Sequence, residues 1–499
     1  MGFTNVKNGA ATLIDTGKGS FGEQLVAIPY PTAQGDFVAG INPQVFITSS
    51  LGDTATVTVA NGVVTASCGT TASGSADVQL RRNVKYRPGQ LVECRFTAIF
   101  DPGVEGTQQK AGVGNTKSGY YVGYRGTDYG FFHEYNGRQR IQKFTINSAG
   151  NANETVTITL NGDSTSFVMN PGSSMTAAAS IIASQSYSAL IPGWLTEVQG
   201  SDIYFISERS FDANGAYTFG TTGTTTATVT NVQSASFPTV DFTPQASWNI
   251  DPLNGSGPSR MTIDPQKGNV YGITFQYLGF GNAVLYAEDP EVGTPQPVHM
   301  VQNANARNLT VLDDPNGRGR WVAINDGSAT SVSLKGGSIG TFINGTVRPE
   351  IGVKNSKLVT KSHSGNDGEV LLAAYRADRY AMNRASNGEM VFLAISAGTE
   401  VTEPVLVRIR RNPRFTTTPS WSKFDAAESI VSFTTTGVVT EGNIVTTIVI
   451  PGGGSIQVSL QEYDVNMNTG DVYAITVQSL KASSSAANTH VSLNWAELQ

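Results

Sequence analysis

The chain has 499 residues, of which only 14% are charged, against roughly 25% in an average soluble domain. Hydrophobic residues make up 39%, and the 54 Gly residues, together with abundant Thr, Ser and Asn, fill the remainder. These residue types favour turns and strands, so the composition excludes a mostly helical protein.

The charge and the apolar pattern exclude further classes. A net charge of −6 disfavours nucleic-acid binding through phosphate neutralisation. No run of about 18 apolar residues occurs, so we expect no membrane span. The opening residues Met-Gly-Phe-Thr-Asn-Val lack the apolar segment of a secretion signal, and Val6 stands where a myristoylation signal has Ser or Thr. We therefore expect synthesis in a cytoplasm, with Cys68 and Cys94 as buried free thiols.

Residues 1–45 contain many Gly and Pro and show no sustained apolar period. We interpret them as an extended N-terminal arm. An arm without its own core has to lie on the following domain or on a neighbouring subunit.

Residues 46–145 and 233–360 are predicted to form one discontinuous β-sandwich domain. In Leu91–Phe100 apolar and polar residues alternate, as in a half-buried antiparallel strand. Gly119–Tyr135 reads as an aromatic hairpin, and the alternating residues of Tyr271–Tyr277, followed by a Gly-rich turn, predict a second one.

Residues 146–232 are predicted to be an inserted β-β-α-β-β module. Strands are expected at Thr155–Leu160 and Ser166–Met169, and a helix at Met175–Gln185, with Ser173 or Ser174 as its N-cap. The uncharged, Thr- and Gly-rich tract between Asp212 and Asp241 is interpreted as a linker.

Residues 361–499 carry eight predicted strands and suggest a closed sandwich or jelly roll. The predicted fold class is thus all-β: a multidomain β-sandwich or jelly-roll protein with a small inserted α+β module and an extended N-terminal arm.

No motif predicts a catalytic, cofactor or metal site. The four histidines have no zinc-ligand spacing, and the acidic runs Glu288–Glu291 and Asp313-Asp314 do not follow a calcium-loop spacing. The Gly-rich stretches Gly17–Ser20 and Gly317–Arg320 lack the context of a phosphate loop and are interpreted as turns.

Acidic residues in aromatic strands could serve as the paired carboxylates of a glycosidase. The sequence cannot test this, because the two acids of a glycosidase come together only in three dimensions. The sequence leaves this open for Glu93, Asp128, Glu134 and Asp202. Our expectation is a protein without enzymatic activity.

Two basic clusters invite two interpretations, outward charges that protect an edge strand or a docking patch for an acidic partner subunit. A third reading, nucleic-acid binding, is disfavoured by the net charge. The clusters consist of Arg81, Arg82, Lys85 and Arg87, and of Arg408, Arg410, Arg411 and Arg414.

The aromatic hairpin also has two interpretations. Its rings can pack in the core, or some can stack on sugars, with Tyr121, Tyr124 and Tyr129 as the candidate glycan contacts. Because neighbouring strand residues point to opposite faces, at most every second ring is available to a ligand.

Four segments resemble a pattern found in structural, virion- or fibre-associated proteins of tailed bacteriophages and related large aquatic DNA viruses. They are RRNVKYRPGQLVECRFTAIFDPGV (Arg81–Val104), VGNTKSGYYVGYRGTDYGF (Val113–Phe131, with Tyr129 in place of Phe), GPSRMTIDPQKGNVYGITFQYLGFGNAVLYAED (Gly257–Asp289) and SLNWAEL (Ser492–Leu498). The resemblance implies a virion component assembled in the host cytoplasm and brings no catalytic residues.

From this resemblance we expect a surface-exposed tail or fibre-type attachment component, or a capsid-surface decoration. The expected partners are copies of the chain, as a homotrimer, other virion proteins and host surface glycans, with no nucleic acid. Two alternatives stay open: a carbohydrate-binding adhesin and a glycan depolymerase.

Overall fold

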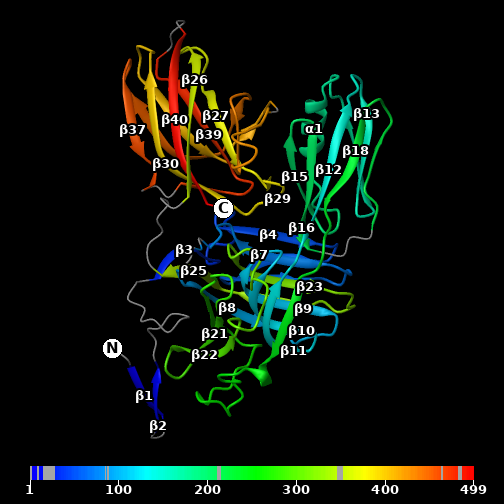
Figure 1. Ribbon diagram of the computed structural model, residues 1–499, viewed down its shortest axis with the longest axis vertical. Helices are drawn as coiled ribbons and strands as arrows, with labels where there is room; N and C mark the ends of the chain where they lie inside the picture. The colour runs from blue at the N-terminus through cyan, green and yellow to red at the C-terminus, as the bar shows by residue number, and fades with distance from the viewer. Residues whose placement is uncertain are drawn as a thin grey trace.

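The computed structural model describes residues 3–7, 10–14, 29–84, 86, 89–210, 215–344, 352–417, 419–461, 465–481 and 486–498. Their elements are nearly all antiparallel strands, so the protein is all-β, as predicted. They form a central, an inserted and a C-terminal sandwich, and Figure 1 shows the last two side by side above the first. Within these ranges the structure has no helix long and apolar enough to span a bilayer.

The central sandwich packs two sheets face to face. One sheet has the order β19 (Thr239–Pro244), β11 (Asp128–Tyr135), β10 (Gly119–Arg125), β9 (Thr107–Gly114), β23 (Arg318–Asn325), β7 (Ser75–Leu80) and β4 (Phe46–Leu51). The other runs through β22 (Thr294–Val301), β21 (Ala283–Asp289), β20 (Asn269–Phe275), β8 (Val92–Phe100), β24 (Ser333–Gly336), β6 (Val63–Ser67) and β5 (Thr56–Ala60), and β25 (Ser338–Asn344) joins it through β8 and β3 (Pro29–Asp36). A 3-10 turn, η1 (Gln245–Ser247), follows β19.

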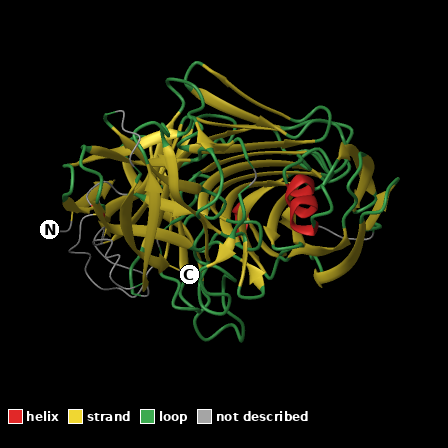
Figure 2. Cartoon of the chain, turned by 90° about the horizontal axis from the view of Figure 1, so that it is seen from above, coloured by secondary structure: helices red, strands yellow, loops and turns green. Residues whose placement is uncertain are grey.

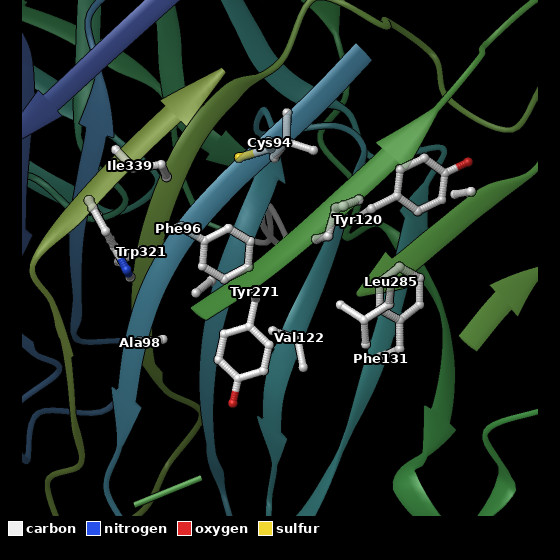
Figure 3. Packing of buried hydrophobic residues seen from close by; sticks show 14 of the residues in the cluster. Cys94, Phe96, Ala98, Tyr120, Val122, Phe131, Tyr271, Leu285, Trp321 and Ile339 are labelled. Carbon is white, nitrogen blue, oxygen red and sulfur yellow. The ribbon is translucent and has the colours of Figure 1, made fainter. Parts of the chain in front are cut away.

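The core of this sandwich lies between its sheets (Figure 3). Strand β8 contributes Cys94, Phe96 and Ala98, which are buried, while the residues between them are partly or fully exposed, as the alternation predicted. The ring of Phe96 stacks on Tyr271 of β20 at 5.6 Å between centroids. Trp321 of β23 is fully buried and donates its indole N–H to the Thr97 carbonyl at 2.9 Å.

The inserted domain is larger than the predicted module. One of its two sheets has the order β15 (Trp194–Gln199), β16 (Asp202–Ser210), β12 (Gln139–Ser148) and β18 (Thr226–Gln233). The other has the order β14 (Asp163–Met169), β13 (Glu154–Leu160) and β17 (Thr218–Thr221). The helix α1 (Met175–Ala183), red in Figure 2, is capped as predicted, because the Ser174 hydroxyl accepts the Ala177 N–H at 3.2 Å. Its buried face of Ala178, Ala179 and Ile182 joins the core of this domain.

The C-terminal sandwich has five strands in one sheet and six in the other around a single core. The first contains β26 (Val353–His363), β40 (Ala487–Leu498), β30 (Glu389–Thr399), β37 (Ser455–Ser459) and β38 (Asn466–Asn468). The second contains β33 (Ser422–Lys423), β34 (Val431–Thr434), β27 (Val370–Ala377), β39 (Val472–Ser479), β31 (Val405–Arg411) and β36 (Asn443–Ile450). Two short pairs complete it, β28 (Tyr380–Ala381) with β29 (Arg384–Ala385), and β32 (Arg414–Phe415) with β35 (Val439–Thr440).

The predicted arm is only partly separate from the sandwich. Strands β1 (Phe3–Lys7) and β2 (Ala10–Ile14) form a hairpin of their own, apart from the sandwiches in Figure 1. Strand β3, by contrast, pairs with β25, and Phe37 is fully buried against Phe46. Residues 29–45 therefore belong to the central domain, and the expectation of an arm through residue 45 is wrong for this part. The remaining arm residues lie outside the described ranges.

Two other predicted boundaries are also wrong. The module begins before residue 146, because β12 pairs with β16 and β18 and its Phe144 lies in the module core. The C-terminal domain begins before residue 361, because β26 pairs with β40 along its whole length. In addition, the tract interpreted as a linker holds β17 and β18, whose Thr-rich sequences suit a half-exposed strand.

Candidate functional site

A cavity of about 1050 Å³ lies where the three domains meet. Its floor is the face of the seven-stranded sheet that points away from the core. In β7, Ala76 and Val78 are buried in the core, whereas Asp77 and Gln79 line the cavity, because successive strand residues point to opposite faces. The same alternation places Lys110, Tyr121, Glu134 and Arg320 of the neighbouring strands on the floor.

The walls come from the other two domains. The inserted domain contributes Leu195, Ile206, Glu208 and Arg209, and the C-terminal domain contributes Arg379, Ala385–Asn387 and Thr469–Asp471. A polar sheet face that would otherwise meet water is thus covered by two further domains.

Charges on the floor are paired with one another. Lys110 Nζ lies 2.6 Å from Glu134 Oε1, and both side chains are less than a tenth exposed. Arg320 forms an ion pair with Asp77. Burial lowers the pKa of Arg320, but the Asp77 carboxylate and other nearby groups raise it by more, so the net shift is upward. Tyr121 completes the floor beside Lys110, whose Nζ lies 5.4 Å from the ring centroid. The floor is therefore a preorganised polar surface.

Three more arginines line the cavity, one from each domain. Arg209 donates to the Ser73 carbonyl at 2.5 Å, Arg318 to Asn83 Oδ1 at 2.7 Å, and Arg379 to the Thr196 carbonyl at 3.4 Å. Burial is the main cause that lowers the pKa of all three guanidinium groups. Near them, the pKa of Glu208 is raised by burial and then by the Asp77 charge.

The inserted and C-terminal domains are tied by a buried carboxylate. Glu197 of β15 accepts hydrogen bonds from the backbone N–H groups of Arg379 and of Tyr380, the latter at 3.0 Å. Its pKa is raised by burial and by the nearby Asp378, against the positive charges of Arg376 and Lys423. The rings of Tyr204 and Tyr380 stack across this interface at 4.1 Å.

The two basic clusters meet at Asp471. Its carboxylate lies 3.6 Å from Arg81 Nη1 and 3.0 Å from Arg411 Nη2. Arg408 and Arg410 both pair with Glu369, at 3.1 Å and 2.7 Å. These side chains form ion pairs within the chain, and the docking-patch interpretation of them stays a prediction.

The rest of the predicted docking patch is divided. Arg414 is exposed and lies 3.8 Å from Glu441, and Arg82 is half-buried in the turn after β7. Lys85 and Arg87 lie outside the described residues.

The candidate glycan tyrosines split between the two faces of their sheet. Tyr129 is buried in the core and donates its hydroxyl to Tyr271 at 2.8 Å, so it cannot meet a ligand. Tyr124 is half-buried against the same core, with its ring 5.2 Å from that of Tyr129. Tyr121 borders the cavity, but it is only 1% exposed, so its ring is no more accessible to a ligand than that of Tyr129.

The acids weighed for catalysis do not converge. Glu93 pairs with Arg95 at 2.5 Å on one sheet, Glu134 pairs with Lys110 on the other, and Asp202 accepts from Thr145 at 2.6 Å in the inserted domain. Among the described residues, no group of three or more His, Cys, Asp or Glu side chains could hold a metal ion.

Sequence reasoning missed Arg209, Arg318 and Arg379, and it was wrong about Gly317–Arg320. Instead of a turn, Arg318 begins β23, which lies inside the seven-stranded sheet. A Cβ at Gly319 would lie 2.7 Å from Ile339 Cδ1, so glycine here permits close packing. The alternation of Gly319, Trp321 and Ala323 against Arg318, Arg320 and Val322 was the signal that could have revealed this strand.

No protein-family model and no curated protein matches the sequence. Among solved structures, the carbohydrate recognition domain of Emp46p in a potassium-bound form aligns over 63% of this chain and 96% of its own, with 10% identity and a TM-score of 0.23. Arcelin-5, a lectin-like defence protein from Phaseolus vulgaris, aligns over 62% and 98%, with 7% identity and a TM-score of 0.22. A structure of Sulfolobus Turreted Icosahedral Virus aligns over 94% and 98%, with 8% identity and a TM-score of 0.16. Likenesses of this size carry no argument about function.

Proposed function

We propose that the protein is a structural component of a virion. The observation that supports this most is where the segments of the resemblance lie. Strand β8, from the first segment, pairs with β20, from the third, and β10 and β11, from the second, face them across the core. Phe96, Tyr120, Phe131 and Tyr271 are buried in that one cluster. Three of the four segments thus fall on a single folded scaffold, and the fourth, Ser492–Leu498, lies in β40 of the C-terminal sandwich.

Within the virion we propose a surface position on a tailed bacteriophage, as a tail or fibre-type attachment component or a capsid-surface decoration. Assembly would take place in the host cytoplasm, as a homotrimer. The hairpin β1–β2 supports assembly with other chains, because it pairs with no further strand among the described residues. An isolated two-stranded hairpin is marginally stable in water, so contact with a neighbouring chain would stabilise it.

Quantitative mass spectrometry of purified particles tests this proposal. We expect the protein in the particle, at hundreds of copies for a capsid decoration or roughly 3 to 18 for a tail component, as closed symmetry requires. Its absence from washed particles would exclude a virion role.

A second candidate is a carbohydrate-binding adhesin, favoured by the polar cavity, which is lined by several amide side chains. Binding on a glycan array that is weakened by Gln79→Ala in a folded protein would support it. A depolymerase remains a third candidate, and absence of new reducing ends after incubation with host polysaccharide would exclude it.

A further inference from the structure

Three of the arginines that line the cavity, Arg209, Arg318 and Arg379, form no ion pair with a carboxylate of the described residues. Each donates a hydrogen bond to a neutral oxygen, namely the Ser73 carbonyl, Asn83 Oδ1 and the Thr196 carbonyl. They come from three domains and line one cavity.

The acids around this space compensate these charges only in part. Asp77 and Glu134 are paired with Arg320 and Lys110, and Asp471 is paired with Arg81 and Arg411. Glu208 and Asp326 form no ion pair among the described residues, but their charges offset part of the burial that lowers the pKa of Arg209. Basic residues outnumber acidic ones in the lining by seven to five, although the chain as a whole carries a net charge of −6. A surplus of positive charge in a largely buried lining is unfavourable, so a bound anion would stabilise this site.

A planar carboxylate is an anion that fits these guanidinium groups, and the phosphate probe described below tests the alternative. The guanidinium fork pairs with a carboxylate through two parallel hydrogen bonds, which the ammonium group of Lys cannot do. The lining also offers amide groups, which both donate and accept hydrogen bonds, as sugar hydroxyls require. These amides belong to Gln79, Asn83, Gln108, Asn316 and Asn387.

The size of the cavity separates a short ligand from a long polymer. A volume of about 1050 Å³ is at the upper end of small-ligand sites, which suits a few sugar units. A nucleic acid instead requires a long basic groove with stacked aromatic rings.

We propose that the cavity binds a short segment of an acidic glycan, with Arg209, Arg318 and Arg379 holding its carboxylates. This inference rests on the attachment role proposed above and identifies the class of receptor. Purified protein tests it, and virion mass spectrometry tests the structural role separately, so either can fail without the other.

The first test is isothermal titration calorimetry of the full-length protein with three acidic oligosaccharides: trigalacturonate, a hyaluronan tetrasaccharide and 3′-sialyllactose. We expect at least one to bind, with an affinity that falls as salt is raised. The methyl ester of the same oligosaccharide should bind at least about tenfold more weakly, because only its carboxylates have changed. Absence of binding by all three at about 1 mM, or equal binding of acid and ester, would overturn the proposal.

Substitutions locate the site. Arg318→Gln and Arg209→Gln should each weaken binding of that oligosaccharide by roughly tenfold, and Arg318→Lys should recover only part of the loss. Arg414→Gln, at an exposed arginine away from the cavity, is the matched control and should bind like wild type. Unchanged affinity in folded Arg318→Gln and Arg209→Gln would overturn the proposal.

Hexaglutamate and inorganic phosphate are the competing probes. Binding of hexaglutamate that exceeds binding of every oligosaccharide would assign the cavity to an acidic peptide and overturn the glycan proposal. An affinity for phosphate equal to that for the oligosaccharides would show a general anion site and would also overturn the glycan proposal. If an arginine variant does not fold, as judged by circular dichroism, the comparison of acid and ester on the wild type decides alone.

Discussion

The carboxylate of Glu197 in the inserted domain accepts the backbone N–H of Tyr380 in the C-terminal domain at 3.0 Å. The same oxygen accepts the N–H of Arg379, and the other oxygen accepts from Gln199 at 2.7 Å. One buried side chain thus satisfies donors on both sides of a domain interface and fixes one wall of the cavity.

We predict that Glu197→Gln loosens this interface. The amide of Gln has one acceptor oxygen in place of two, so a buried donor loses its partner, at a cost of about 1–3 kcal/mol in the free energy of unfolding. Hydrogen exchange should increase in β15 and in β28. Glu105→Gln, at an exposed carboxylate, is the control. Unchanged exchange in both strands of the Glu197 variant would contradict the prediction.

Acidification should destabilise the protein because two buried histidines become protonated on unfolding. Burial is the main cause that lowers the pKa of His133 and of His299 to about 4 from the usual 6.5. For His133, Arg307 lowers the pKa as well, while the Val311 carbonyl, Asp241 and Glu134 raise it.

The sign follows from proton linkage. Between pH 6.5 and 4 these two histidines are protonated in the unfolded chain but not in the folded protein. Stability is therefore fully present above pH 6.5 and is lost as pH falls toward 4. Each histidine should contribute about 2–3 kcal/mol to this loss. Urea unfolding at stepped pH measures it, and His133→Gln with His299→Gln should flatten the slope.

A third prediction concerns Asp471, where the two basic clusters meet. Asp471→Asn removes the charge that pairs with Arg81 and Arg411 and leaves both guanidinium groups largely enclosed. We expect a loss of roughly 2–4 kcal/mol, measured by denaturant unfolding, with Asp53→Asn as the exposed control. Equal stability of the two variants would show that the clusters act independently of Asp471.

The two thiols should be unreactive in the folded protein. Cys68 and Cys94 are free and fully buried, and burial raises the pKa of the Cys94 thiol, which disfavours the reactive thiolate. Ellman's reagent should therefore label neither cysteine under native conditions and both in denaturant. Rapid labelling of the native protein would show that the core opens readily.

Strand positions followed from the sequence where one face of a strand is buried. The alternation in Val92–Phe100 and the capping serine before Met175 are local signals, and both elements lie where they were predicted. The exceptions are strands rich in Gly or Thr, such as β23, β17 and β18, whose apolar face is reduced to a few residues.

Pairing partners could not be predicted in the same way. Strand β12 reads as a strand in sequence, but only its hydrogen bonds to β16 and β18 assign it to the inserted domain. Likewise, Arg81 and Arg411 read as free surface cations, because the Asp471 that neutralises them is chosen by proximity in space.

By itself the sequence therefore determined the all-β class, the alternating faces of its strands and the one cap of its helix, since these depend on neighbours a few residues apart. The tertiary structure decided what covers each face. Alternation directs Asp77, Lys110 and Arg320 away from the core, which in sequence means toward water. The packing of two other domains over that face encloses these charges in a cavity, because domain contacts depend on residues hundreds of positions apart.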